Sequence, residues 1–304
     1  MRKGLYWGAQ AFAAVVVAVM VWRAIEHNWS EFRSLHVSLA LRPAWIGLSI
    51  LVVFLTYAIQ VSSWRRILAG WAQHLPYGQA ARIWLLVNLG RYIPGKVWSV
   101  AGLVVLAQRA GVEGWAAGAS AIAMQAVGIG TAVALVAAAT PGAASPVRLA
   151  GAALVSVATI AFLAWERGAR AVVRLVGGGA EFRPVPLVAV AESTGLSLLS
   201  WITYGMAFWL LSRGLGLPDT LSLARAAGAF ALGYILGWLA LFAPGGVGVR
   251  EVVLIGLLAP ALGAGGAVAL SVASRILLTL TEVAAPLGAL LISGKTKGEP
   301  GVRT

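Results

Sequence analysis

The sequence contains no cysteine and very little charge. The absence of cysteine excludes disulfides and thiolate metal sites. Only 11% of the 304 residues are charged, and Asp and Glu together number 10, so few carboxylates are available for an acid–base pair. The histidines His27, His36 and His74 all fall in predicted loops, where we assign them no metal or acid–base role. We therefore expect no metal and no cofactor.

Catalytic and nucleotide-binding motifs are also missing. The chain has no HExxH zinc motif, no GxSxG nucleophile turn, no Walker loop and no dinucleotide fingerprint in a βαβ context. We therefore expect a protein that is not an enzyme. Without an ATP site, any transport that it performs is expected to be passive or driven by an ion gradient.

The sequence is instead rich in apolar residues, which make up 60% of the chain with a mean hydropathy of +0.87. This composition predicts several membrane-spanning helices, each needing about 20 apolar residues, within a single integral membrane domain over 1–304. The first run follows Arg2 and Lys3 but is long for a signal peptide, and we interpret it as a retained helix. Uncharged runs cover 4–22, 43–64, 114–147, 149–165, 193–212, 226–249 and 252–274.

The basic residues are spread over the loops between these runs. A net charge of +13 invites a nucleic-acid interpretation, but no compact basic domain exists, so we expect no nucleic-acid partner. The distribution fits the positive-inside rule with both termini in the cytoplasm, in the inner membrane of a bacterium or archaeon. In this orientation the cytoplasmic basic residues are Arg2, Lys3, Arg65, Arg66, Arg82, Arg109, Arg167, Arg170, Arg174, Arg183, Lys295, Lys297 and Arg303.

The predicted fold is an all-α polytopic membrane protein with about eight membrane segments. Two of them, 79–108 and 226–259, are interrupted by Pro-Gly steps and are expected to be re-entrant hairpins, or alternatively pairs of tilted crossing helices. Two halves, 5–139 and 148–293, would run in opposite directions as an inverted-topology repeat, with a cytoplasmic loop at 166–186. The predicted spanning helices, about six in number, are 5–22, 43–64, 114–139, 149–165, 192–212 and 269–293.

The two interrupted segments carry charges at membrane depth. Residues 88–98 read NLGRYIPGKVW and residues 241–251 read LFAPGGVGVRE. An ionisable group at the bilayer centre costs about 2.5–3.5 kcal/mol on insertion scales, so each needs a partner or a polar cavity. Helix starts after the Pro-Gly steps would point amides at an anion. The candidate site, with a net charge that suits an anionic substrate, consists of Arg91, Lys96, Arg250, Glu251, Arg275 and Glu282.

Structural roles for the same residues are open alternatives. Arg91 and Lys96 would then snorkel to the headgroups and anchor a hairpin. The pairs Arg250–Glu251 and Arg275–Glu282 would be ion pairs that tie helices together. Gln125 could equally form a hydrogen bond between helices or bind a ligand. Small residues are expected to serve close helix packing rather than a pathway: Gly228, Gly233, Gly237, Gly263, Gly265 and Gly266.

The motifs at 90–98 and 243–251, followed by Ser274, Arg275 and Glu282, resemble the lysylphosphatidylglycerol synthase transmembrane family. The resemblance covers about 5–293. This family includes the flippase domain of bacterial multiple peptide resistance factors and stand-alone flippase-like membrane proteins. Its full-length synthases add an aminoacyl-transferase domain, whereas this sequence ends at Thr304, so we expect no synthesis of lysylphosphatidylglycerol.

The resemblance implies that a phospholipid or a polyprenyl-phosphate lipid moves between the leaflets, with the six candidate residues at the headgroup. Glu251 or Glu282 would orient the arginines or carry a coupling ion. An alternative is a non-transporting accessory that binds a lipid carrier for a glycosyltransferase or lipid synthase, docked through 166–186. An intramembrane transferase is disfavoured because no catalytic constellation is present.

Overall fold

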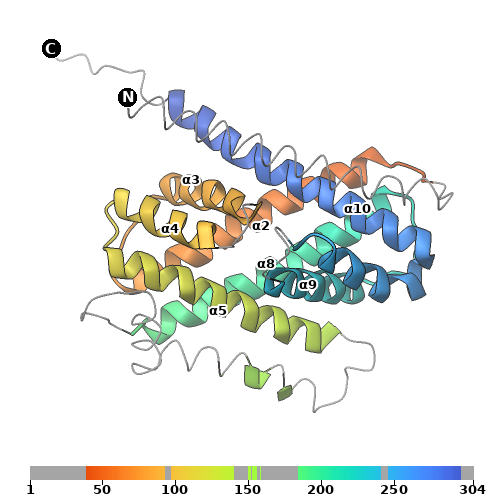
Figure 1. Cartoon of the computed structure of the whole chain (residues 1–304), viewed down its shortest axis with the longest axis horizontal. Coiled ribbons are helices and arrows are strands. Elements are labelled where there is room, and N and C mark those ends of the chain that lie inside the picture. The colour runs from red at the N-terminus through yellow and green to blue at the C-terminus, as the bar shows by residue number, and fades with distance from the viewer. Residues whose placement is uncertain are drawn as a thin grey trace.

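The computed structural model describes residues 39–92, 97–139, 184–240 and 246–295, together with 150–151, 153–155 and 158. Every regular element in this part of the chain is helical, which confirms the all-α prediction there (Figure 1). The predicted helix 5–22, Lys96 and the loop 166–183 lie outside the described residues, as does most of the predicted helix 149–165. The elements in chain order are α2 (Pro43–Gly70), α3 (Tyr77–Asn88), the 3₁₀ turn η1 (Leu89–Tyr92), α4 (Val97–Arg109), α5 (Gly114–Ala139), α8 (Leu187–Gly214), α9 (Leu223–Leu239) and α10 (Val249–Lys295).

Four of these helices are long and apolar enough to cross a membrane: α2, α5, α8 and α10 up to Gly288. They confirm a multi-pass membrane protein. The bounds of α5 are those predicted, and α2 and α8 each contain their predicted span and extend it. The larger number of membrane segments and the inverted repeat remain predictions.

Helices α2 and α8 make the most extensive contact in the described part of the chain. Serine and threonine side chains join the two helices. These residues are small, so the helix backbones can approach closely, and a hydroxyl group in apolar surroundings needs a hydrogen-bond partner. Ser63 Oγ lies 2.8 Å from Ser193 Oγ, and Thr56 Oγ1 donates to Thr203 Oγ1 over 2.8 Å. Ser49 Oγ donates to the carbonyl of Ala207 over 2.7 Å. The two helices are therefore joined by hydrogen bonds of buried hydroxyl groups at three places along their contact.

In each interrupted segment, the described residues on the two sides of the interruption lie next to each other. Helices α3 and α4 are 12 and 13 residues long, about 18–20 Å each, whereas the apolar core of a bilayer is about 30 Å thick. They pack against each other, and a Cβ on Gly90 would lie 3.0 Å from the amide nitrogen of Ser99. Likewise, a Cβ on Gly246 would lie 2.9 Å from the Cα of Gly237, so α10 starts beside the end of α9.

Helix α10 is two helical arms that meet at Gly263, whose φ of 72° and ψ of 162° are not helical. Arg275 contacts Glu251 at 3.1 Å, although 24 residues of continuous helix would separate them by about 36 Å. The chain therefore reverses direction between the two arms (Figure 1). A Cβ on Gly263 would meet nothing within 4 Å, so the prediction that this glycine serves helix packing is wrong: it serves the reversal.

Contacts between the loops define two ends of the bundle. At one end the amide of Arg42 donates to the carbonyl of Gly214 over 2.8 Å, and the Thr220 hydroxyl donates to the carbonyl of Ala261. At the other end the Gln73 side chain donates to the Glu113 carboxylate over 3.1 Å. The start of α2, the end of α8 and the reversal of α10 therefore share one end, and the loops after α2 and α4 share the other.

Candidate functional site

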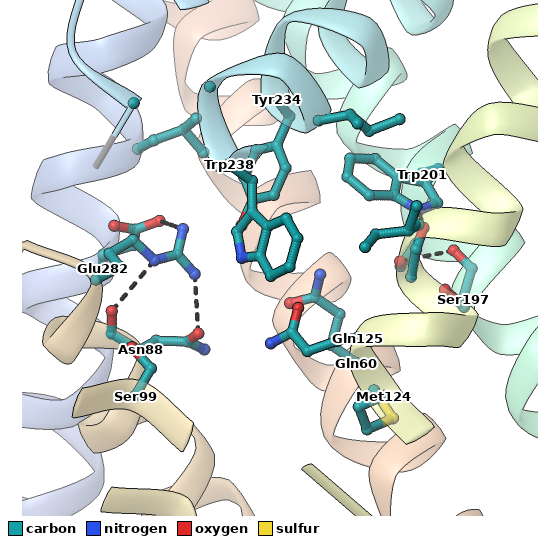
Figure 2. A pocket seen from close by; sticks show the side chains of 18 of the residues that line it. Gln60, Asn88, Ser99, Met124, Gln125, Ser197, Trp201, Tyr234, Trp238 and Glu282 are labelled. Atoms are coloured by element: carbon teal, nitrogen blue, oxygen red, sulfur yellow. Dashed lines mark hydrogen bonds and ion pairs between the residues drawn. The ribbon is translucent and has the colours of Figure 1, made fainter. Parts of the chain in front are cut away.

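A cavity of about 190 Å³ lies inside the bundle, where the two hairpins meet α2, α5 and α8. Side chains from all the main elements reach it (Figure 2). The polar and aromatic lining residues are Gln60, Ser63, Trp84, Asn88, Arg91, Ser99, Gln125, Ser197, Ser200, Trp201, Tyr234, Trp238, Arg250, Arg275, Thr279 and Glu282.

Arg91 is held at one side of this cavity by contacts with Asn88, Glu282 and Tyr234. Its Nη1 donates to Glu282 Oε1 over 2.7 Å, while Nε and Nη2 donate to the carbonyl and the side-chain oxygen of Asn88 over 3.2 and 2.8 Å. Its guanidinium also lies 5.8 Å from the ring centre of Tyr234. The 3₁₀ turn η1 brings Asn88 within reach of Arg91, and Figure 2 shows these bonds beside Glu282. The side chain therefore faces the interior rather than snorkelling outward.

Glu251 uses both of its carboxylate oxygens within the protein. Oε2 accepts a hydrogen bond from the amide of Gly248 over 2.7 Å, which caps the start of α10, as an acidic residue at the third helical position commonly does. Oε1 accepts from Arg275 Nη1 over 3.1 Å, and both side chains are buried. The anion at this helix start is therefore the chain's own carboxylate, which fastens the first arm of α10 to the second.

Arg250 differs from the other two arginines. It is 7% exposed and lines the cavity, yet no carboxylate among the described residues lies within 4 Å of it. Its Nη2 lies 3.5 Å from Ser274 Oγ, and its guanidinium lies 4.8 Å from the ring centre of Phe230. A Cβ on Gly237 would lie 3.3 Å from Arg250 Cβ, so this glycine of α9 leaves space for the side chain. A buried cation thus faces the cavity.

The structure brings the predicted charges together, but in a different pairing. Arg91, Arg250, Arg275 and Glu282 line the cavity, and Glu251 lies behind them, whereas Lys96 is outside the described residues. The ion pairs are Arg91–Glu282 and Arg275–Glu251, not Arg250–Glu251 and Arg275–Glu282. Consecutive residues point to different sides of a helix, so Arg250 and Glu251 do not face each other. The reversal at Gly263 then brings Arg275 to Glu251.

Some cavity residues were missed by the sequence analysis. Trp84 Nε1 and Ser99 Oγ are buried, and neither has a hydrogen-bond partner in the part of the chain that the structure describes. Both line the same cavity as the arginines. A tryptophan or a serine in an apolar helix is common and carries no distinctive signal. Gln60 was missed as well, although its amide lines the same cavity as that of Gln125.

The sequence model described as the lysylphosphatidylglycerol synthase TM region matches residues 10–285. The chain belongs to this family. A comparison with curated proteins gave no match. In this member of the lysylphosphatidylglycerol synthase transmembrane family, the matched region contains all the described helices except the end of α10. The family membership predicted from the two Pro-Gly motifs is thus confirmed by a match over most of the chain.

The described part of the cavity has an excess of positive charge. Three arginines, Arg91, Arg250 and Arg275, face two carboxylates, Glu251 and Glu282, which leaves one net positive charge. No group of three His, Asp or Glu side chains placed to hold a metal ion occurs among the described residues. In this family member the cavity therefore offers a positive charge, hydrogen-bond donors and aromatic rings, which together suit binding of an anion.

Proposed function

We propose that this member of the lysylphosphatidylglycerol synthase transmembrane family is a lipid flippase or transporter. It would move an anionic phospholipid or a polyprenyl-phosphate-linked lipid between the leaflets of the cytoplasmic membrane. The observation that carries the proposal is Arg250, a buried cation that lines the cavity with no described carboxylate against it. A buried charge without a partner is costly, and a bound phosphate would supply that partner.

The polar groups of the cavity support a phosphate as the ligand. Arginine binds phosphate oxygens in a bidentate manner, and Trp84 and Ser99, whose donors have no partner among the described residues, line the same cavity as Arg250. Glu282 holds Arg91 in place and Glu251 holds Arg275, so the positive charges of the cavity are already positioned before a ligand binds. We assign the headgroup contacts to Arg91, Arg250 and Arg275, with Glu251 and Glu282 as positioning residues and Lys96 as a further cation.

The arrangement of the helices supports transport rather than simple binding. In each half of the described chain a long helix is followed by a short interrupted hairpin and another long helix, and the cavity lies between the two hairpins. Paired interrupted helices of this kind mark the sites of transporters built from inverted repeats. We propose that 5–139 and 148–293 are such repeats within one membrane domain, and that rocking of the halves opens the cavity to either leaflet.

The test is lipid movement in proteoliposomes. Fluorescent phosphatidylglycerol and phosphatidylcholine are reconstituted with the wild-type protein, with Arg250→Gln, and with Arg82→Gln as a matched control on the exposed face of α3. We expect the wild type to move the anionic lipid faster than the zwitterionic one. Arg250→Gln should move the anionic lipid about tenfold more slowly or worse, since a charged hydrogen bond contributes about 1.5–3 kcal/mol. Arg82→Gln should move it at the wild-type rate.

The possible outcomes separate the site from the function. If Arg250→Gln moves lipid as fast as the wild type, the proposed arginine site is wrong, but the protein is still a lipid transporter. If no phospholipid moves, a vesicle that contains a polyprenyl phosphate is tested next. Binding of that lipid without movement would overturn the flippase proposal in favour of a lipid-carrier-binding accessory of a glycosyltransferase or lipid synthase.

A further inference from the structure

Two neutral amides lie on the side of the cavity away from the Arg91–Glu282 pair. Gln60 of α2 and Gln125 of α5 both line the cavity, and Figure 2 shows their side chains reaching into the space beside Trp238. Neither amide makes a hydrogen bond with any group in the described part of the chain. Each offers two N–H donors and a carbonyl acceptor. Two such groups in the interior of an apolar bundle are costly unless something polar binds them.

The other polar groups nearby are already paired within the protein. Thr131 Oγ1 lies 2.9 Å from Ser197 Oγ, and Ser63 Oγ lies 2.8 Å from Ser193 Oγ. Ser200 Oγ donates to the carbonyl of Ser197 over 2.7 Å. The hydroxyl groups therefore hold the helices together, whereas the two glutamine amides are available for a ligand.

Aromatic rings form the rest of this wall. The Trp201 indole N–H donates to the carbonyl of Gly128 over 3.0 Å, which fixes the ring against α5. Tyr234 meets Trp201 edge to face, with ring centres 5.2 Å apart, and Trp238 lies between the ionic side and the Trp201 side of the cavity in Figure 2. Rigid aromatic faces beside neutral amides provide both stacking surface and hydrogen bonds in both directions.

From this juxtaposition we propose that the headgroup carries a neutral, hydroxyl-bearing group beyond its phosphate, such as glycerol or a sugar, and that Gln60 and Gln125 bind its hydroxyls. The proposal rests on the proposed phosphate site at Arg250. A hydroxyl group both donates and accepts, as the amides do, whereas an ammonium only donates. The one carboxylate among the described lining residues, Glu282, is already bound to Arg91, so this side has no anion for an ammonium headgroup.

The test compares lipid binding in detergent, measured by quenching of the tryptophan fluorescence. The lipids are phosphatidylglycerol, phosphatidylinositol as a lipid with a ring polyol, phosphatidate without an alcohol, and phosphatidylethanolamine with an ammonium. They are titrated against the wild type, Gln60→Leu, Gln125→Leu and the double variant. Gln79→Leu, at an exposed position of α3, is the matched control.

We expect the wild type to bind the hydroxyl-bearing lipids about tenfold or more tightly than phosphatidate, which corresponds to two ligand hydrogen bonds. The double variant should bind them and phosphatidate alike, each single variant should lose part of the preference, and Gln79→Leu should keep it. Tighter binding of phosphatidylglycerol would indicate a glycerol-like group, and tighter binding of phosphatidylinositol a sugar-like one.

Several results would overturn the inference. They are equal binding of phosphatidate, tighter binding of phosphatidylethanolamine, binding of none of the lipids, or a preference that survives in all the glutamine variants. The inference and the proposed function fail separately: selective binding without movement in proteoliposomes would overturn transport alone. Movement of anionic lipid with no dependence on Gln60 or Gln125 would overturn the inference alone.

Discussion

At the scale of single residues, the cavity contains two kinds of buried arginine. Arg275 is bound to Glu251, whose other oxygen caps α10, so this pair connects two arms of the fold. Arg250 contacts a serine hydroxyl and an aromatic ring instead. The same residue type thus forms an ion pair between helical arms in one position and is proposed to bind a ligand in the other. The two roles differ in what a substitution does to stability.

Replacing Glu251 by leucine should destabilise the protein strongly. The change leaves Arg275 buried without its partner and removes the cap on α10, and breaking one side of a buried ion pair costs about 3–5 kcal/mol. Thermal unfolding in detergent should show this loss. The double variant Glu251→Leu/Arg275→Leu should be less destabilised than the sum of the single variants, because it strands no charge. Additive effects would contradict the pairing.

Replacing Arg250 by glutamine should affect stability much less. No described carboxylate is left without its partner, and the Ser274 hydroxyl keeps its bond to the carbonyl of Ser271. We expect a change of within about 1 kcal/mol, the range of a single neutral hydrogen bond. A loss as large as that of Glu251→Leu in the same melting experiment would make Arg250 a structural residue and remove the basis of the proposed phosphate site.

At the scale of elements, the reversal at Gly263 decides the geometry of the site. Its backbone angles, φ 72° and ψ 162°, lie in a region open almost exclusively to glycine. Gly263→Ala should therefore destabilise the protein by about 1–3 kcal/mol, measured by thermal unfolding. It should also weaken the contact between Glu251 and Arg275, since the reversal brings their helical arms together.

Gly256 provides the control for this prediction. It lies in the helical first arm of α10, and a Cβ there would meet nothing within 4 Å. Gly256→Ala should leave stability unchanged or raise it by up to about 1 kcal/mol, because alanine is the better helix former. Equal effects at both glycines would show that position 263 needs no special backbone conformation.

Part of the fold and of the candidate site is predictable from the sequence alone. Apolar runs predicted α2, α5 and α8, because a spanning helix needs only length and hydrophobicity. The Pro-Gly motifs located the interrupted segments, and the expense of buried charge identified the arginines. The pairing of Arg91 with Glu282 and of Arg275 with Glu251 could not be predicted, since it depends on the reversal at Gly263. Neither could the roles of Trp84, Ser99 and Gln60, which only tertiary packing brings to the cavity.

At the scale of the whole molecule, the bundle has two distinct ends. One holds the start of α2, the loop after α8 and the reversal of α10, and the other holds the loops after α2 and α4. The positive-inside rule predicts that the second end lies in the cytoplasm. This orientation decides from which leaflet each interrupted hairpin would enter the membrane.

The absence of cysteine makes this orientation directly testable. His74→Cys and Pro218→Cys place single thiols at exposed positions of opposite ends. In intact cells a membrane-impermeant maleimide should label position 218 and not position 74, and permeabilised cells should show labelling of both. Labelling of position 74 alone would reverse the orientation. Labelling of both in intact cells would mean that the two ends lie on the same side of the membrane, which would disprove the predicted crossings and, with them, the inverted repeat.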